Sequence, residues 1–149
     1  MRAVVQRVKR ASVAVDGEAV GTIGAGLLVL LGIEAGDDAG DTRYIAEKCV
    51  NMRIFDDEND VMNLSVQDVD GEILLVSNFT LYGDIRKGRR PSYIRAAKPD
   101  DAKHVFTQCV NMFKEKYGKV ETGGFQAMMD VSLVNDGPVT ILLDSKKGF

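Results

Sequence analysis

The chain has 149 residues, and its 19 lysines and arginines stand against 22 aspartates and glutamates, a formal net charge of −3. This length predicts one domain, residues 1–149. The acidic balance argues against a protein that coats nucleic acid, which usually has a basic domain. No apolar run approaches the ~18 residues that cross a bilayer, and we identify no signal peptide, so we expect a cytoplasmic protein with no membrane partner.

The first third of the chain predicts four strand-like segments. Residues 2–10 and 12–15 have the pattern of strands, Asp16-Gly17 is a tight-turn signal, and residues 18–23 return. Together they predict a β-hairpin. Residues 27–33 form a continuous apolar run bounded by glycines, which is typical of a strand buried on both faces.

Two segments have the period of a helix. Residues 37–52 place apolar side chains at i, i+4 and i+7, and Pro99 opens a second apolar 3–4 pattern that Gly118 ends. Cys49 and Cys109 fall on the apolar faces of these helices. We therefore expect buried thiols that act as small hydrophobes, with no disulfide.

Further strands are expected at residues 54–55, 72–82, 125–133 and 139–143, with a turn at 135–138. Strands outnumber helices, and several suit antiparallel pairing. The pattern predicts an α+β fold: a compact antiparallel or mixed, β-barrel-like sheet with two main helices packed outside.

Several familiar site motifs fail on inspection. Residues 21–26 read G-x-x-G-x-G, but a strand follows, whereas a phosphate cradle needs a helix N-terminus. Residues 56–67 begin like a calcium loop but lack the glycine at its sixth position and the glutamate at its twelfth. His104, the only histidine, falls on the polar face of its helix. An enzyme of this sequence would therefore depend on backbone groups, hydroxyls or the substrate itself.

The charge is unevenly distributed along the chain. One segment, residues 86–98, has no acidic residue and six basic ones: Arg86, Lys87, Arg89, Arg90, Arg95 and Lys98. The rest keeps 13 basic and 22 acidic residues, a charge of −9. With Tyr93 among the cations, this segment can hold a phosphate backbone and stack a base. A solvated loop that offsets an acidic body fits the charge equally well.

Two short segments resemble the paired signatures of one enzyme family. Residues 77–81 read S-N-F-T-L and residues 135–140 read N-D-G-P-V-T. They are similar to S-Q-F-T-L and N-x-G-P-V-T of the D-aminoacyl-tRNA deacylases (D-tyrosyl-tRNA deacylase family). Other segments that fit the family, in chain order, are 2–8, 24–32, 53–55, 87–92 and 123–129. The resemblance therefore covers the whole chain.

The resemblance implies a homodimeric hydrolase that cleaves the ester between a D-amino acid and the 3′ end of tRNA, without a metal or other cofactor. It implies an active site at the subunit interface, where a cis Gly137-Pro138 peptide of one subunit enters the pocket of the other. By the same resemblance, Arg7 braces this peptide and Met129 lines the pocket. The implied catalytic residues are Ser77, Asn78, Phe79 and Thr80; those for substrate binding and chiral selection are Gly137, Pro138, Arg7, Met129 and Asn135; those for tRNA binding are Arg86, Lys87, Arg89 and Arg90.

The implied mechanism is physically reasonable. Rigid backbone where an L side chain would project rejects L-amino acids by a clash, but it cannot reject glycine, so we expect cleavage of glycyl-tRNA as well. The ester is already activated, and the neighbouring ribose 2′-hydroxyl can orient water. The protein then supplies positioning and an oxyanion hole, for which N–H groups near Phe79 are candidates. Thr80 has no nearby base, so we expect a positioning role for it, and a local hydrogen bond for Ser77.

Two departures and two alternatives accompany this hypothesis. Asn78 stands where the family usually has glutamine, and Gln126 where glycine or alanine is usual. We expect Gln126 on the face opposite Phe125, Ala127 and Met129. One alternative is a non-catalytic, β-rich RNA-binding module. The other is a metal-dependent hydrolase that uses carboxylates such as Asp56 and Asp60.

Overall fold

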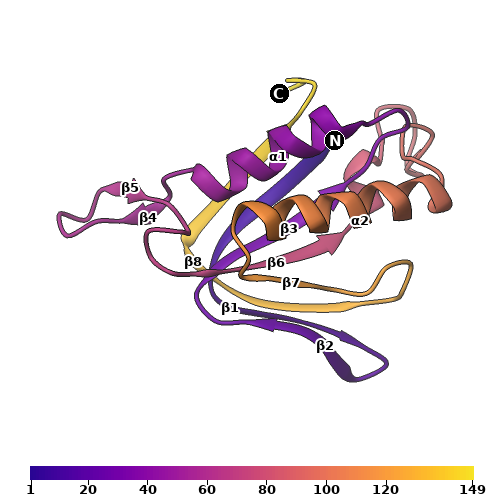
Figure 1. Ribbon diagram of the computed structural model, residues 1–149. Helices are drawn as coiled ribbons and strands as arrows, with labels where there is room; N and C mark the ends of the chain where they lie inside the picture. The colour runs from indigo at the N-terminus through magenta and orange to yellow at the C-terminus, as the bar shows by residue number, and fades with distance from the viewer.

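A computed structural model describes all of residues 1–149 (Figure 1). The elements, in chain order, are β1 (Arg2–Val15), β2 (Glu18–Ile23), β3 (Gly26–Gly32), α1 (Ala39–Asn51), β4 (Phe55–Asp56), β5 (Met62–Leu64), β6 (Glu72–Ser77), the 3₁₀ helix η1 (Phe79–Tyr82), α2 (Pro99–Lys116), β7 (Val120–Thr122) and β8 (Asp130–Asp144). None of the helices has the length and apolar character that crossing a bilayer requires.

The main sheet is mixed and strongly curved. Its strand order is β2-β1-β3-β6-β7, and β8 pairs with the other edge of β1. The β1–β2, β1–β3 and β1–β8 pairs are antiparallel, whereas β3–β6 and β6–β7 are parallel. The sheet curls until β2 meets β7: a Cβ on Gly21 would lie 2.4 Å from the carbonyl oxygen of Thr122. Helices α1 and α2 pack together against one side (Figure 1). The expected α+β, barrel-like class is confirmed.

The core has two parts, one on each face of β3. Leu27, Val29 and Leu31 belong to a cluster of 21 buried residues beneath the helices. Leu28 points the other way, into a cluster of seven on the inner side of the curved sheet. The strand is therefore buried on both faces, as its unbroken apolar run predicted.

Capping residues close in sequence determine where the two helices begin and end. Asp38 caps α1, because its side chain accepts hydrogen bonds from the N–H groups of Gly40 and Asp41. Pro99 opens α2, and Gly118 follows its end at a φ of +93°. Cys49 and Cys109 are fully buried and unpaired. Both helices and both free thiols are as predicted.

The strand expected over residues 72–82 is wrong in its second half. β6 ends at Ser77, and η1 follows. The cause is Asn78, whose side-chain oxygen accepts a hydrogen bond from the N–H of Thr80 at 3.3 Å and so turns the chain.

The C-terminal strands also differ from the prediction. β8 begins at Asp130, because residues 125–129 are irregular and Gln126 has a φ of +52°. Gln126 is exposed but does not occupy a strand.

The turn expected at 135–138 is instead a wide bulge inside one continuous strand. Val8 pairs with Asn135 and Gln6 pairs with Thr140, so four residues of β8 stand opposite one residue of β1. The short strand β7 was not predicted.

Candidate active site

The Ser77–Thr80 segment forms a tight corner at the end of β6. The N–H of Asn78 donates to the carbonyl oxygen of Leu31 at 2.8 Å, which fixes the start of the corner. The hydroxyl of Thr80 donates to the Asn78 side-chain oxygen at 2.5 Å. The Phe79 N–H is the first of η1, so no carbonyl within that helix can accept it. The corner thus presents a backbone donor and a hydroxyl whose proton is already engaged.

The basic segment folds beside this corner. Phe79 is 56% exposed, and its ring meets that of Tyr93 edge to face at 5.0 Å. Reciprocal backbone hydrogen bonds of 2.9 Å between Asp84 and Ser92 close the loop between them. Arg86 pairs with Asp84 at 2.6 Å and, through these hydrogen bonds, holds the pKa of Asp84 below its ordinary value. The structure therefore brings the motif of residues 77–80 together with the basic loop.

Three cations of this loop are free of partners. Their side chains are exposed and make no ion pair: Lys87, Arg89 and Arg90. Free, solvated cations on a loop can approach a polyanion without first breaking a salt bridge.

The second motif lies in the bulge of β8. The Gly137-Pro138 peptide is cis and both residues are exposed. Asn135 closes the bulge from within, because its side chain accepts from the N–H of Val139 at 2.7 Å and donates to the Val139 carbonyl oxygen at 3.2 Å. The amide oxygen and nitrogen of Asn135 are both hydrogen-bonded to the backbone, so Asn135 acts on a ligand by shaping this loop.

Arg7 lies beneath the same loop with only 7% of its side chain exposed. Its Nε donates to the carbonyl oxygen of Asp136 at 2.9 Å, and its Nη1 donates to that of Ile54 at 2.7 Å. The carboxylates of Asp56 and Asp136 lie 3.4 and 3.7 Å from the guanidinium. Asp56, a candidate metal ligand in one alternative, therefore compensates the charge of Arg7.

Within one chain the two motifs contact β1 through different residues. Arg2 donates to the carbonyl oxygen of Leu81, beside the first motif, whereas Arg7 holds Asp136. Arg2 and Arg7 are five positions apart on β1, a rise of about 17 Å along an extended strand. The two motifs are therefore anchored to β1 at different points of its length.

Met129 packs against the smaller core cluster, which includes Val76, the residue before the first motif. Its sulfur is next to Gly123, and the same cluster contains Val13. The residue is partly buried. In this chain alone it supports the irregular segment that leads into β8.

The classical nucleophiles and bases of the chain lie elsewhere. His104 is exposed on α2, where its ring contacts the side chain of Gln108 at 3.1 Å. Burial raises the pKa of the Cys109 thiol to about 12, and burial raises that of Cys49 further, so neither forms a thiolate near neutral pH. No three His, Cys, Asp or Glu side chains converge as metal ligands.

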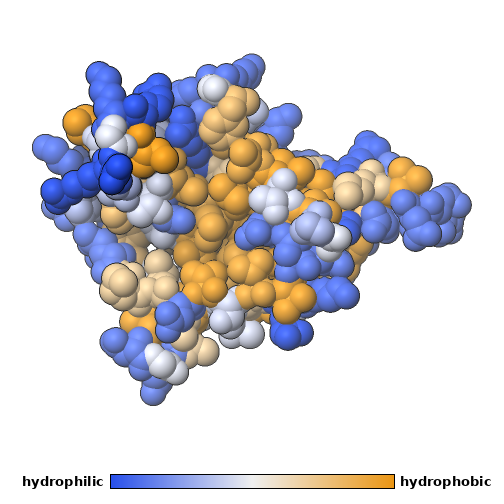
Figure 2. All heavy atoms as spheres, turned by 180° about the vertical axis from the view of Figure 1, so that it is seen from behind, coloured by the Kyte–Doolittle hydropathy of each residue, from blue (hydrophilic) through white to orange (hydrophobic).

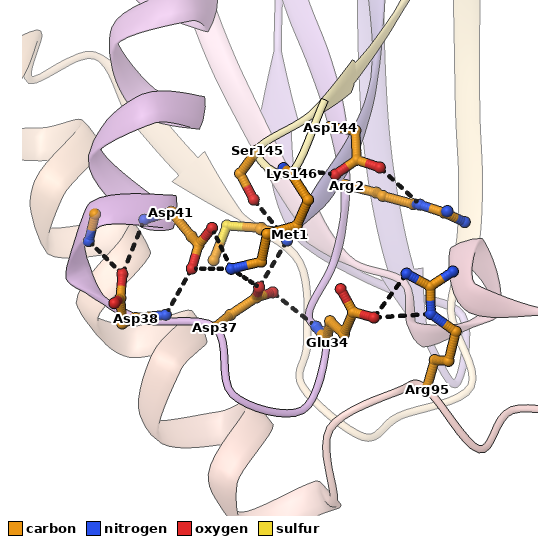
Figure 3. Close-up of polar contacts among 11 residues, drawn as sticks. Met1, Arg2, Glu34, Asp37, Asp38, Asp41, Arg95, Asp144, Ser145 and Lys146 are labelled. Carbon is orange, nitrogen blue, oxygen red and sulfur yellow. Dashed lines mark hydrogen bonds and ion pairs between the residues drawn. The ribbon is translucent and has the colours of Figure 1, made fainter. Parts of the chain in front are cut away.

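An ion network that sequence reasoning missed joins the N-terminus to the segment before α1 and to Arg95 (Figure 3). The N-terminal ammonium of Met1 donates to the buried carboxylate of Asp37 at 2.7 Å. Asp37 also accepts from the N–H of Glu34, and Glu34 pairs with Arg95 at 2.7 Å. The partners are 36 and 61 residues apart in sequence, so no local pattern indicates them.

The rear face of the molecule is broadly apolar. Figure 2 shows hydrophobic side chains over the middle of the face opposite the helices, with hydrophilic ones at its margins. β8 runs behind the helices in Figure 1 and pairs only with β1, so its other edge is open. Leu133 and Leu142 of this strand are 36% and 58% exposed. An open edge with exposed leucines favours association with another chain.

Comparisons with known proteins agree with this architecture. Residues 4–144 match the family model described as D-Tyr-tRNA(Tyr) deacylase. Over 149 residues, which are 100% of both chains, the protein is 62% identical to the D-aminoacyl-tRNA deacylase of Thermosipho africanus (strain TCF52B). It is 59% identical, with the same coverage, to the D-aminoacyl-tRNA deacylase of Caldicellulosiruptor saccharolyticus (strain ATCC 43494 / DSM 8903 / Tp8T 6331).

Solved structures are similar as well. One described as "c-Myc DNA Unwinding Element Binding Protein" has a TM-score of 0.92 and 40% identity, covering 97% of this chain and 98% of that one. Another, titled "Structural Analysis of a probable eukaryotic D-amino acid tRNA deacylase", has a TM-score of 0.78 at 15% identity, covering 95% and 97%, and shows the shared fold. The fold and the two motifs define a hydrolase of the class that acts on aminoacyl-tRNA esters. Within that class, the chain belongs to the D-Tyr-tRNA(Tyr) deacylase family.

Proposed function

We propose that this protein hydrolyses the ester between a D-amino acid and the 3′-terminal adenosine of tRNA, releasing the free amino acid and tRNA. The proposal rests on one observation, namely how each of the two motifs is held and which groups it leaves exposed. One is a corner with an available backbone donor at Phe79. The other is an exposed Gly137-Pro138 peptide, held by Arg7 at a different point of β1 from the point where Arg2 contacts the corner.

A second copy of the chain brings the motifs together in this proposal. Gly137-Pro138 of one subunit projects into the pocket beside Thr80 of the other, which gives a homodimer with two shared sites. The exposed position of the peptide and the open, apolar edge of β8 support this arrangement. In solution, the homodimer should elute with twice the chain mass of 16.3 kDa. A monomer that is fully active at every dilution would contradict the shared site.

Chiral selection follows from the rigidity of that peptide. Arg7 and Asn135 hold the residues on either side of Gly137-Pro138. Backbone fixed in this way excludes an L side chain by a clash and leaves the D side chain outside. Glycine has no side chain to exclude, so glycyl-tRNA is a substrate in this proposal.

The chemistry requires little from side chains. The Phe79 N–H stabilises the developing oxyanion, and the substrate's 2′-hydroxyl orients the attacking water. Thr80 donates to Asn78, so its role is to hold the corner. Ser77 ends β6 and sets the position of that corner. No metal or other cofactor enters the reaction as proposed.

The tRNA contacts come from the basic loop. Arg86, Lys87, Arg89 and Arg90 are exposed beside Phe79, where they can hold the phosphates of the acceptor end. A protein that edits charged tRNA works where tRNA is charged, so we place it in the cytoplasm.

The decisive experiment compares D-Tyr-tRNA with L-Tyr-tRNA, with and without EDTA. We expect release of D-tyrosine in both conditions and no release of L-tyrosine. Equal rates for the two enantiomers would disprove the chiral filter, and loss of activity with EDTA would favour a metal-dependent hydrolase. Salt-sensitive tRNA binding without turnover would instead identify a non-catalytic RNA-binding module.

A further inference from the structure

A cleft of about 270 Å³ opens directly after the Thr80 corner. Its wall is made by the end of η1, the start of the basic loop and the first strand. The lining residues are Arg2, Tyr82, Gly83, Asp84, Ile85, Arg86 and Arg95. We call it the Arg2–Arg95 cleft. Along the chain, its lining residues 82–86 lie between Thr80 and the free cations of the loop.

Two guanidinium groups are fixed against the ring of Tyr82 in this cleft. Arg2 lies 4.8 Å from the ring centroid and Arg95 lies 5.5 Å from it. Arg2 also donates to the carbonyl oxygen of Leu81 at 3.3 Å. Figure 3 shows both arginines on the same side of the ion network. Aromatic and hydrogen-bond contacts restrict both side chains before any ligand arrives, which lowers the entropy cost of binding.

The carboxylates that pair with these arginines lie outside the cleft wall. Asp144, 3% exposed, lies 3.4 Å from Arg2, and Glu34, 16% exposed, lies 2.7 Å from Arg95. Neither lines the cleft. A guanidinium has five N–H donors, and each arginine retains donors at a terminal nitrogen: Nη2 of Arg2 and Nη1 of Arg95 make no hydrogen bond.

The cleft wall has three arginines and the single carboxylate of Asp84. Because each arginine is paired with one carboxylate, the cleft offers oriented N–H donors and not an excess of positive charge. Tyr82 stays neutral, because burial and the nearby charges of Asp37, Glu34 and Asp144 raise the pKa of its hydroxyl. Planar, fixed guanidinium groups suit the oxygens of a phosphate, which they can hold through paired N–H donors.

We propose that the Arg2–Arg95 cleft binds the phosphodiester that joins the 3′-terminal adenosine of the substrate RNA to the preceding nucleotide. This inference rests on the proposed function, because it places the terminal ester at the adjacent corner. Arg2 and Arg95 then hold the end of the RNA chain in register, while the loop cations hold phosphates further along. The cleft explains how a protein with a net charge of −3 can grip a polyanion at one point.

The test compares two D-tyrosyl esters, D-Tyr-tRNA and D-tyrosyl-adenosine, of which the second has no phosphate. We expect Arg95→Gln and Arg2→Gln to raise KM for D-Tyr-tRNA about tenfold and to leave KM for D-tyrosyl-adenosine unchanged. They should also reduce the slope of the logarithm of tRNA affinity against the logarithm of salt concentration by about one, which corresponds to the loss of one phosphate contact. Arg95→Lys, which keeps the charge but not the planar fork, should raise KM for the tRNA by a smaller factor and retain the fold.

The matched control is Lys119→Gln. Lys119 is 48% exposed and ion-paired like Arg95, which is 49% exposed, but it lies beside the opposite end of β6. Its loss should change neither KM. An equal rise of KM for both esters in the cleft variants, or no rise for either, would overturn the proposal.

A failure of the proposed function is distinguishable from a failure of the cleft. If the unaltered protein hydrolyses neither ester, the proposed function is wrong, and binding of RNA oligonucleotides then tests the cleft. The probes differ only in their last linkage, which is a phosphodiester or an uncharged methylphosphonate. Tighter binding of the phosphodiester, lost in Arg95→Gln but kept in Lys119→Gln, supports the cleft. Equal binding of the two probes by the unaltered protein contradicts it.

Discussion

Arg7 donates its Nε hydrogen to the carbonyl oxygen of Asp136 at 2.9 Å, across the bulge where four residues of β8 face one residue of β1. The backbone ladder is interrupted there, and a side chain from β1 takes the place of the missing pairing. The geometry of Gly137-Pro138 thus depends on a charge 129 residues earlier in the chain.

The first prediction concerns this charge. Arg7→Leu should lower the free energy of unfolding by about 2–4 kcal/mol, because two backbone carbonyls lose a charged donor in a largely buried position. It should also reduce discrimination between D- and L-Tyr-tRNA. Urea denaturation and the ratio of the two deacylation rates measure these effects. Lys9→Leu, an exposed position on the same strand, is the control; unchanged stability and discrimination in Arg7→Leu would contradict the bracing role.

The second prediction uses the conformation of Gly137. Its φ is +140°, and a Cβ there would lie 2.8 Å from Cγ2 of Val139 and 3.0 Å from its nitrogen. Gly137→Ala should therefore displace the Gly-Pro peptide and abolish chiral discrimination. Gly17→Ala is a matched control, since Gly17 also has a positive φ, +82°, but open space around it. It should cost about 1 kcal/mol of stability and leave deacylation intact. Equal kinetics in the two variants would rule out the filter.

The third prediction separates the backbone of Phe79 from its ring. Phe79→Pro removes the N–H that we assign to the oxyanion, at a first helical position where proline fits. Phe79→Ala keeps that N–H and removes only the contact with Tyr93. We expect Phe79→Pro to lower kcat by a further factor of about 10²–10³ relative to Phe79→Ala. Single-turnover kinetics with D-Tyr-tRNA make the comparison, and identical kcat values would remove Phe79 from the oxyanion hole.

The fourth prediction concerns the hydroxyl of Thr80. Because it donates to Asn78, its removal should loosen the corner rather than stop the chemistry. Thr80→Ser should behave like the unaltered protein, and Thr80→Ala should lose about tenfold in kcat, which corresponds to roughly one hydrogen bond. A loss of many orders of magnitude with substrate binding intact would identify Thr80 as a nucleophile.

The fifth prediction is a dependence of stability on pH. Burial of Asp41 opposes its ionisation, but hydrogen bonds from Lys146, Ser145 and the backbone of Asp38 prevail and lower its pKa below the ordinary value. An unfolded aspartate has a pKa of ~3.9, so this stabilisation is complete above that pH and is lost as the pH falls below it. Asp41→Asn should be less stable at pH 7, with a flatter decline between pH 4 and pH 2.

Urea midpoints from pH 7 to pH 2 test this dependence. Asp16→Asn, at the exposed tip of the first hairpin, should follow the unaltered protein throughout. If Asp41→Asn declines as steeply as the unaltered protein below pH 4, then Asp41 contributes nothing to acid sensitivity.

Local signals predicted the parts of the fold that local chemistry determines. Pro99 and Gly118 marked the ends of α2, and the apolar run of β3 indicated a strand buried on both faces. The corner after Ser77 was missed because one side chain, Asn78, turns a segment whose apolar residues otherwise suit a strand.

Partners distant in sequence determine the rest. Residues 135–138 have every local property of a turn, but β1 pairs with β8 on both sides of them and converts the turn into a bulge. Arg95 likewise pairs with Glu34, a residue 61 positions earlier in the chain that no local pattern indicates. The residues of the candidate site were therefore indicated by motif, whereas the separation of the two motifs within one chain could come only from the folded structure.

The pairing of β1 with β8 also bears on how the protein is made. The strands join residues 2–14 to residues 130–144, and the N–H of Ser145 donates to the carbonyl oxygen of Met1. During translation, the first strand can pair with β2 and β3 early, but its other edge has no partner until the last strand is synthesised. The Gly-Pro peptide and the contact from Arg7 that holds it are therefore assembled at the end of synthesis, so a growing chain on the ribosome lacks the element that we propose as the chiral filter.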